Sequence, residues 1–233
     1  MDDPRSPSPD SSPAPENTAH PASPDADAKD AAPKAASAST ATRDRILDAA
    51  SAELARAGYA GARMESIAEL AGIRKQVIYY YFPSKAALAR EVLVRSNRRA
   101  VDFWTAFRTA TLTEVMRAAV ERAHDTPDEV AHLLWEGQEY QNHLGLSLTM
   151  EPSRARDMRL IIDLIQRSQA AGDIDASLPS DLLGLSVILL SLGPAAYPQI
   201  VPIVAGTEWN TPEFTARWAQ FCMDALTRLT RPS

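Results

Sequence analysis

Residues 72–82, GIRKQVIYYYF, contain several side chains that can donate hydrogen bonds to a polyanion. Arg74, Lys75 and Gln76 precede three consecutive tyrosines. A glutamine can bond N6 and N7 of adenine, and a lysine can donate to guanine. A tyrosine can donate its hydroxyl to a phosphate and pack its ring on a thymine methyl group. These residue types therefore suit contacts in the major groove of DNA.

A helix over residues 74–82 would separate these side chains into two faces, because successive residues turn by about 100°. Ile78 and Phe82 are four residues apart and form a buried edge. Gln76, Tyr79 and Tyr80 stand at i, i+3 and i+4 on the outward face, and the third tyrosine points to the flank. The alternative is that the tyrosines pack against a partner helix or lie at an ordinary surface.

Neighbouring helices must position this one. Apolar residues at helical spacing predict a first helix with Thr42 as its N-cap and Gly58 as its stop. A second, short helix ends at Gly72, and a fourth begins after Ser84 and continues past Trp104. Residues 63–82 then form a helix-turn-helix, since about three residues around a glycine join the second and third helices.

Residues 42–93 read TRDRILDAASAELARAGYAGARMESIAELAGIRKQVIYYYFPSKAALAREVL. This segment contains four short motifs: Ile67-Ala68, Ala71-Gly72-Ile73, Ile78-Tyr79-Tyr80-Tyr81-Phe82 and Ser84-Lys85. With this spacing the segment resembles the DNA-binding region of the TetR family of transcriptional regulators. The resemblance and the helical periodicity predict an all-α fold. They imply an N-terminal three-helix helix-turn-helix domain and a C-terminal helical domain for ligand binding and dimerisation.

The resemblance also implies roles for single residues. Side chains at the positions of Lys75, Gln76, Tyr79 and Tyr80 approach bases or the adjacent backbone, and those of Tyr81 and Lys85 contact phosphates. The full set of DNA-binding candidates is Thr42, Arg63, Arg74, Lys75, Gln76, Tyr79, Tyr80, Tyr81 and Lys85.

Three positions depart from the family pattern. Arg74 stands where the recognition helix usually begins with a Ser or Thr cap, so a cap worth about 1 kcal/mol is lost. We expect Arg74 to bind phosphate instead. Val77 replaces a small hydroxyl residue, which removes a phosphate hydrogen bond there. Arg63 also replaces a Ser or Thr, and it either adds a phosphate contact or is a solvated charge.

Charge is unevenly distributed along the 233 residues, whose formal net charge is −6. Residues 1–40 carry −4, residues 41–99 carry +5 and residues 100–233 carry −7. A basic block inside an acidic chain favours a local contact with a polyanion, although a solvated helical face has the same composition.

Several protein classes are disfavoured. One cysteine, Cys222, excludes an internal disulfide and fits a reducing compartment. Neither a signal segment nor an apolar run of membrane-spanning length is present, so we expect a cytoplasmic protein, bacterial and nucleoid-associated on the resemblance. There is no Gly-rich phosphate loop, no HExxH and no histidine near Cys222 in sequence. We expect no enzyme and no cofactor; a helical adaptor that does not bind DNA is the other alternative.

Composition predicts three regions. Residues 1–40 are rich in Pro, Ser, Ala and Asp, and we expect a disordered acidic tail that is either dispensable or a competitor for the basic block. Residues 41–101 are the expected DNA-binding domain. Residues 102–233 are the expected ligand-binding and dimerisation domain, with helices broken near Pro127, Pro152, Pro179 and Pro212.

The resemblance implies a small-molecule effector bound between helices of the second domain. The candidates for its pocket are aromatic, Met and Glu side chains, each of which could equally be plain core: Phe103, Trp104, Phe107, Trp135, Glu139, Tyr140, Met150 and Met158.

One polar stripe lies along a predicted helix, at i, i+4, i+7 and i+11: His132, Glu136, Glu139 and His143. Two imidazoles and two carboxylates could bind a metal, but a solvated polar face beside an apolar one (Val130, Leu133, Leu134 and Leu144) is the preferred interpretation, and no metal site is expected. The acids could also line a pocket for a cationic ligand.

Two apolar helices near the C-terminus, over about 180–204 and 212–230, are the expected dimer interface; the alternative is that both are internal core. Two-fold dimers are the usual solution for a helix-turn-helix, which alone spans only a few base pairs. We therefore expect a ligand-responsive transcriptional regulator, a repressor by resemblance. It would bind a pseudo-palindromic operator as a homodimer and be released by an effector.

Overall fold

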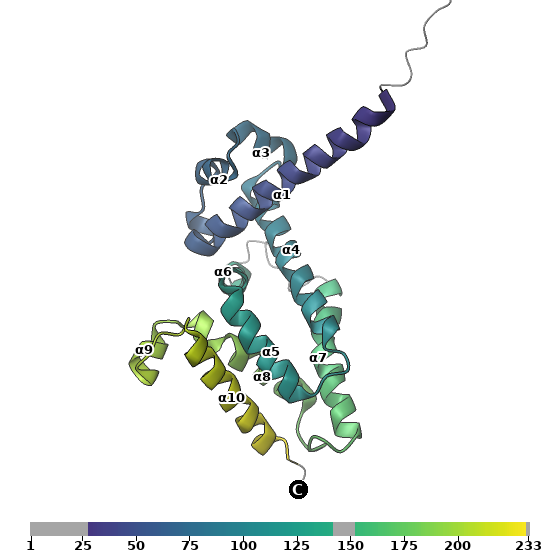
Figure 1. Cartoon of the computed structure of the whole chain (residues 1–233), viewed down its shortest axis with the longest axis vertical. Helices are drawn as coiled ribbons and strands as arrows, with labels where there is room; N and C mark the ends of the chain where they lie inside the picture. The colour runs from purple at the N-terminus through teal and green to yellow at the C-terminus, as the bar shows by residue number, and fades with distance from the viewer. Residues whose placement is uncertain (1–27, 142–151, 232–233) are drawn as a thin grey trace, which may run out of the picture. The chain divides into compact units, whose positions relative to one another are not determined.

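The computed structural model describes residues 28–141 and 152–231, and helices are the only regular secondary structure in those ranges (Figure 1). The all-α prediction is confirmed. In chain order the helices are α1 (Ala28–Gly61), α2 (Met64–Ala71), α3 (Lys75–Tyr81), α4 (Lys85–Ala106), α5 (Leu112–Asp125), α6 (Pro127–Gln141), α7 (Pro152–Ala170), α8 (Ser180–Ala196), α9 (Ile200–Ala205) and α10 (Pro212–Leu229).

The start of α1 differs from the prediction. The helix begins at Ala28, so Thr42 lies inside it and is not an N-cap. Residues 28–40, which were expected in the disordered tail, belong to this helix, while residues 1–27 lie outside the described residues. Alanine favours helix, and residues 28–41 include seven alanines, which offers a local reason for the longer helix. Gly58 does interrupt the helical geometry, with φ 65°, although helical residues resume up to Gly61.

Tertiary contacts divide the chain into Met1–Ala41 and Thr42–Ser233, and two hydrophobic cores lie within the second unit. The first core joins α1, α2, α3 and α4. Its most buried members include Ile46, Leu54, Ile67, Ile78 and Leu88. Packing from all four helices holds α2 and α3 in place as a helix-turn-helix.

The turn between α2 and α3 depends on Gly72. Its φ of 64° places it in the left-handed region, where a side chain is strained. The Gly72 N–H donates to the carbonyl of Glu69 at 3.1 Å, and the Ile73 N–H donates to that of Ala68 at 3.0 Å. These bonds satisfy the last carbonyl groups of α2, as is usual when a glycine closes a helix.

The second core is formed by α5, α7, α8 and α10, with α5 packed against both α8 and α10. Met116, Ile165, Val187 and Cys222 lie at its centre. As predicted, prolines mark the helix boundaries here: α6, α7 and α10 each begin with one, and α8 begins directly after another. A proline suits the first helical position because its missing N–H would have no partner there.

The segment predicted as one long apolar helix over 180–204 is instead two helices. α8 ends at Ala196 and the six-residue α9 follows from Ile200. Pro198 lies between them and cannot donate a helical hydrogen bond, which is consistent with the break.

Candidate nucleic-acid interface

The two faces of α3 match the predicted partition. Ile78 is 0% exposed and Phe82 is 2% exposed, so the inner edge is fully packed. On the opposite side Tyr80 is 83% exposed, and Gln76 and Tyr79 are also exposed. An amide and two phenols therefore point to solvent from a rigid helix.

Tyr81 takes the intermediate position expected for the flank. It is half-buried and packs against the first core. Its ring meets that of Tyr80 edge to face, with the centroids 5.2 Å apart. Such an arrangement is favourable for aromatic pairs and limits where the exposed Tyr80 ring can lie.

Arg74 is the N-cap of α3, and its backbone is extended, with φ −77° and ψ 143°. No side chain caps the helix, as expected for arginine, which has no hydrogen-bond acceptor. The side chain of Arg74 is exposed next to the outward face, and Val77 is half-buried.

Lys75 forms an ion pair with Glu65 of α2, which sequence reasoning missed. The hydrogen bond to Lys75 lowers the pKa of Glu65, and the same bond raises the pKa of Lys75. The Lys75 ammonium also lies 5.8 Å from the centre of the Tyr79 ring. Both side chains belong to the surface shared by α2 and α3, so a carboxylate stands beside a proposed base-reading group.

Lys85 lies in the first turn of α4, directly after its cap. Ser84 Oγ accepts a hydrogen bond of 3.0 Å from the Ala87 N–H. The Lys85 ammonium stands 4.8 Å from the centre of the Tyr59 ring and 3.4 Å from the Ala60 carbonyl oxygen. The end of α1 therefore positions this cation.

Arg63 is exposed and serves as the N-cap of α2 without a side-chain cap bond. Its backbone N–H donates to the carboxylate of Glu53 at 3.3 Å, and Arg56 forms an ion pair with that carboxylate at 2.8 Å. Burial raises the pKa of Glu53, but these two donors outweigh burial and hold the pKa below its ordinary value. Glu53 thus anchors the backbone from which the Arg63 side chain projects. Thr42, the remaining candidate, is half-buried within α1.

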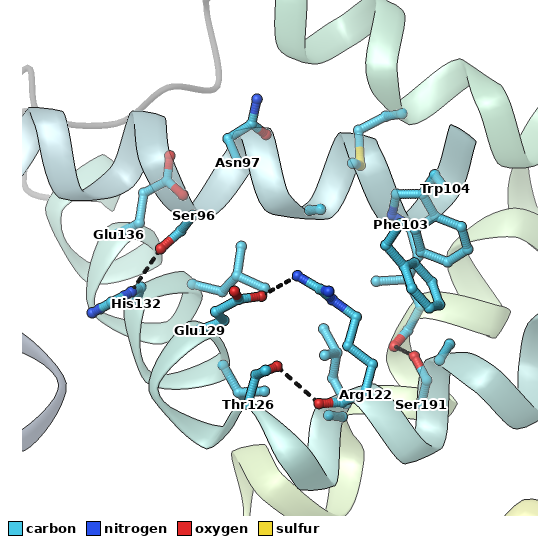
Figure 2. Close-up of a pocket in the computed structure, with 18 of the residues that line it drawn as sticks. Ser96, Asn97, Phe103, Trp104, Arg122, Thr126, Glu129, His132, Glu136 and Ser191 are labelled. Carbon is cyan, nitrogen blue, oxygen red and sulfur yellow. Dashed lines mark hydrogen bonds and ion pairs between the residues drawn. The ribbon is translucent and has the colours of Figure 1, made fainter. Parts of the chain in front are cut away.

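A cavity of about 320 Å³ lies among α4, α5, α6, α7 and α8 (Figure 2). Of the predicted pocket residues, Phe103, Trp104 and Met158 line it. Four candidates do not line it: Phe107, Trp135, Glu139 and Tyr140. Met150 lies outside the described residues.

Packing explains why those four candidates do not line the cavity. Phe107 packs against the second core, and Trp135 belongs to the first, where it stacks on Tyr59 at a centroid distance of 6.3 Å. Tyr140 is exposed, and Glu139 is buried away from the cavity. Helical spacing alone could not separate these surroundings.

Polar groups occupy defined places in the mostly apolar wall. Arg122 forms an ion pair with Glu129 and lies 5.1 Å over the Phe103 ring. At the other end, His132 Nδ1 is 2.9 Å from the hydroxyl of Ser96 (Figure 2). The cavity can hold a mainly apolar molecule and offers it charged and hydrogen-bonding groups.

The polar stripe of α6 points inward, so the predicted solvated face is wrong. His132, Glu136 and Glu139 are all buried, whereas Leu133 and Leu134 of the expected apolar face are exposed. His132 has hydrogen-bond partners on α1 and α4, which explains its inward position. His143 lies outside the described residues, and in the described ranges no group of three potential ligands could hold a metal.

Cys222 is fully buried in the second core, and burial raises the pKa of its thiol to about 11. A thiol of this kind is a poor nucleophile. Within the described residues, no helix combines the length and apolar character needed to span a membrane.

Fold and site together define a DNA-binding helix-turn-helix regulator of transcription. Residues 46–92 match the family described as bacterial regulatory proteins, tetR family. The HTH-type transcriptional repressor SCO4008 of Streptomyces coelicolor is 30% identical over 170 residues, which cover 71% of this chain and 84% of the relative. The chain belongs to the TetR family: it is a bacterial regulator of transcription that binds DNA, and not an enzyme.

Three other similar proteins are also named as regulators of transcription. The HTH-type transcriptional regulator RutR of Escherichia coli is 39% identical over 103 residues, 40% of this chain and 47% of that relative. The transcriptional regulator SCO4942 of Streptomyces coelicolor superposes with a TM-score of 0.65 at 23% identity, covering 79% of this chain and 97% of the other. The ketosteroid transcriptional regulator KstR2 of Mycobacterium tuberculosis gives 0.63 at 17% identity, covering 82% and 95%. At these identities, the two solved structures establish the shared fold.

Proposed function

We propose that the protein is a ligand-responsive repressor that binds a pseudo-palindromic operator as a dimer and is released by a small-molecule effector. The observation that carries the DNA-binding part is the outward face of α3. It presents Gln76, Tyr79 and Tyr80 to solvent while Ile78 and Phe82 hold the helix against the core. Groove-reading side chains need a rigid helix of this kind behind them.

The proposed DNA contacts fall into two classes. Gln76 and Lys75 read base edges, with Tyr79 and Tyr80 packing on bases or sugars beside them. Contacts to the phosphate backbone of the DNA carry no sequence information, but they set the affinity of binding and the register of the protein on the duplex. We assign them to Thr42, Arg63, Arg74, Tyr81 and Lys85.

Dimerisation is proposed through α8 and α10. Both helices expose large apolar side chains in addition to those in the second core: Leu182, Leu185, Leu189, Phe221 and Leu229. Exposed apolar groups gathered on neighbouring elements are typical of an interface. A two-fold pair would present two α3 helices to paired half-sites.

The effector site is proposed in the cavity lined by Phe103, Trp104 and Met158. It lies outside the helix-turn-helix, and it is lined both by α4 residues of the proposed DNA-binding domain over residues 41–101, such as Ser96, and by residues of the proposed ligand-binding and dimerisation domain over 102–233. The name of the relative SCO4008 favours repression over activation. A protein acting on the chromosome in this way works in the cytoplasm, as the sequence led us to expect.

Selection of DNA fragments from a random pool by the full-length protein tests this function. We expect enrichment of a two-fold symmetric site. In the selected site, Gln76→Ala should change the preference among base variants by roughly 1–3 kcal/mol. Lys85→Ala should weaken binding to all sequences equally and reduce the salt slope by about one. A pool without an enriched motif, or an unchanged ranking in Gln76→Ala, contradicts the proposed readout.

A further inference from the structure

Helix α6 takes part in both the effector cavity and the DNA-binding core. Glu129, His132 and Glu136 line the cavity, while Trp135 is buried in the first core against Tyr59. A displacement of α6 by a bound molecule would therefore act on the helices that carry the helix-turn-helix. The side chain placed to pass on such a displacement is that of His132.

His132 is 1% exposed and hydrogen bonded at both ring nitrogens. Nε2 lies 3.1 Å from the carbonyl oxygen of Ser51 in α1, and Nδ1 lies 2.9 Å from the hydroxyl of Ser96 in α4. A carbonyl oxygen can only accept, so Nε2 carries the proton, and Nδ1 accepts from Ser96. Burial lowers the pKa of His132, which is consistent with this neutral tautomer.

This arrangement makes the ring sensitive to the contents of the cavity. Of the two bonded serines, Ser96 lines the cavity together with His132, while Ser51 lies in the first helix of the DNA-binding core. A buried donor or acceptor without a partner is unfavourable, so α1 and α4 must follow the ring or lose a bond. A molecule that pushes α6 outward, or that bonds to Nδ1 in place of Ser96, changes the restraint on α1.

We propose that His132 is a positioning residue that transmits occupancy of the cavity to the DNA-binding helices through its bond to Ser51. The inference rests on the proposed effector-responsive function. It assigns the coupling to one hydrogen bond between α6 and α1, and it predicts that coupling and binding can be separated by substitution.

The test uses the neutral apolar dye N-phenyl-1-naphthylamine as the probe for the cavity and the selected operator as the DNA. Dye affinity is measured by fluorescence with and without saturating operator. Coupling is reciprocal, so the operator should raise the dye Kd by the factor by which the dye raises the operator Kd. In the wild type we expect a factor of about five or more. Ala100→Trp, which fills the cavity from α4, should abolish dye binding and so locate the dye.

His132→Phe keeps a ring of similar size but removes both hydrogen bonds. The dye and operator affinities of this variant are each measured with and without the other ligand, and we expect the coupling factor between them to fall from about five or more to about one, whatever change the substitution makes to either affinity alone. His132→Gln should restore coupling, since its amide nitrogen can replace Nε2 as the donor to Ser51. The matched control is His124→Phe, because the half-buried His124 is likewise hydrogen bonded, to Thr215, but does not line the cavity.

The outcomes separate the inference from the function. Full coupling in a folded His132→Phe overturns the inference and leaves the effector function standing. A wild type that does not bind the dye, or binds it without any effect of DNA, contradicts the effector function of this cavity and the inference with it. If circular dichroism shows that His132→Phe is unfolded, His132→Met decides, because it fills the same space and also lacks a donor for the Ser51 carbonyl: its coupling factor should fall to about one, and unchanged coupling counts against the proposal.

Discussion

At the scale of single residues, the ion pair between Glu65 and Lys75 is the contact with the clearest consequence for DNA binding. It holds a carboxylate at the surface that we propose faces the duplex, and it occupies the Lys75 ammonium group of α3. The DNA phosphates repel the Glu65 carboxylate, and DNA must compete with this carboxylate for the Lys75 ammonium. We expect Glu65→Gln to raise affinity severalfold for operator and random DNA alike and to steepen the salt slope by about one.

Fluorescence anisotropy at several salt concentrations measures both quantities. Glu69→Gln, in which an exposed carboxylate of the same helix is neutralised, is the control for overall charge. A loss of affinity in Glu65→Gln would show instead that Glu65 positions Lys75 for the groove.

The burial of His132 also predicts that the stability of the protein depends on pH. Burial holds its pKa in the folded protein below the ordinary value, so the unfolded chain binds the proton first as the pH falls. The free energy of unfolding should therefore decrease as the pH falls through about 6.5 and level off below the folded pKa. We expect Tm to fall more in the wild type than in His132→Gln between about pH 7.5 and about pH 5.5. Equal slopes in differential scanning calorimetry would contradict a buried, neutral His132.

At the scale of elements, the N-terminus of α3 lacks a capping side chain because Arg74 occupies the N-cap position. Its extended backbone suits a serine without rearrangement. Arg74→Ser should raise the free energy of unfolding in urea by about 1 kcal/mol. The same variant should bind all DNA sequences more weakly, since the phosphate contact proposed for Arg74 is lost. Higher stability with unchanged DNA affinity would remove Arg74 from the interface.

Local chemistry was enough to predict several helix boundaries. Gly72, Ser84 and the prolines at the starts of α6, α7 and α10 act through bonds to near neighbours, so their effects can be read from the sequence. The start of α1 was missed because Thr42 is compatible with both a cap and a helix interior. The exposed face of α3 was predicted because two packing residues, Ile78 and Phe82, fix its orientation.

Long-range partners explain the failures. His132 was expected at the surface, but its partner Ser51 lies 81 residues away in the sequence, and nothing local announces that bond. The Lys75–Glu65 pair depends on how α2 meets α3, and Trp135 depends on the position of Tyr59. Periodicity gives the faces of a helix and does not identify the surface that each face meets.

At the scale of the whole molecule, the proposed two-fold operator needs two copies of α3, and we expect a second copy of the chain to pack on the exposed apolar side chains of α8 and α10. Phe221 on α10 is 58% exposed and stacks on Trp218 at a centroid distance of 5.6 Å. Burying a charge at this position is unfavourable, so Phe221→Glu should shift sedimentation toward the monomer and weaken operator binding. Leu70→Glu, at an exposed position of α2, should leave the dimer intact. A monomeric wild type at micromolar concentration would contradict the dimer.

The central claim is that the exposed face of α3 reads DNA. The most direct test compares the affinity of the full chain for its selected operator and for a shuffled duplex at the same salt concentration, in the wild type and in Gln76→Ala with Tyr80→Ala. Tyr80 is 83% exposed, so its removal should leave Tm unchanged. We predict that the ratio of the two affinities collapses toward one while binding to the shuffled duplex persists. An undiminished ratio in the folded double variant would contradict the account.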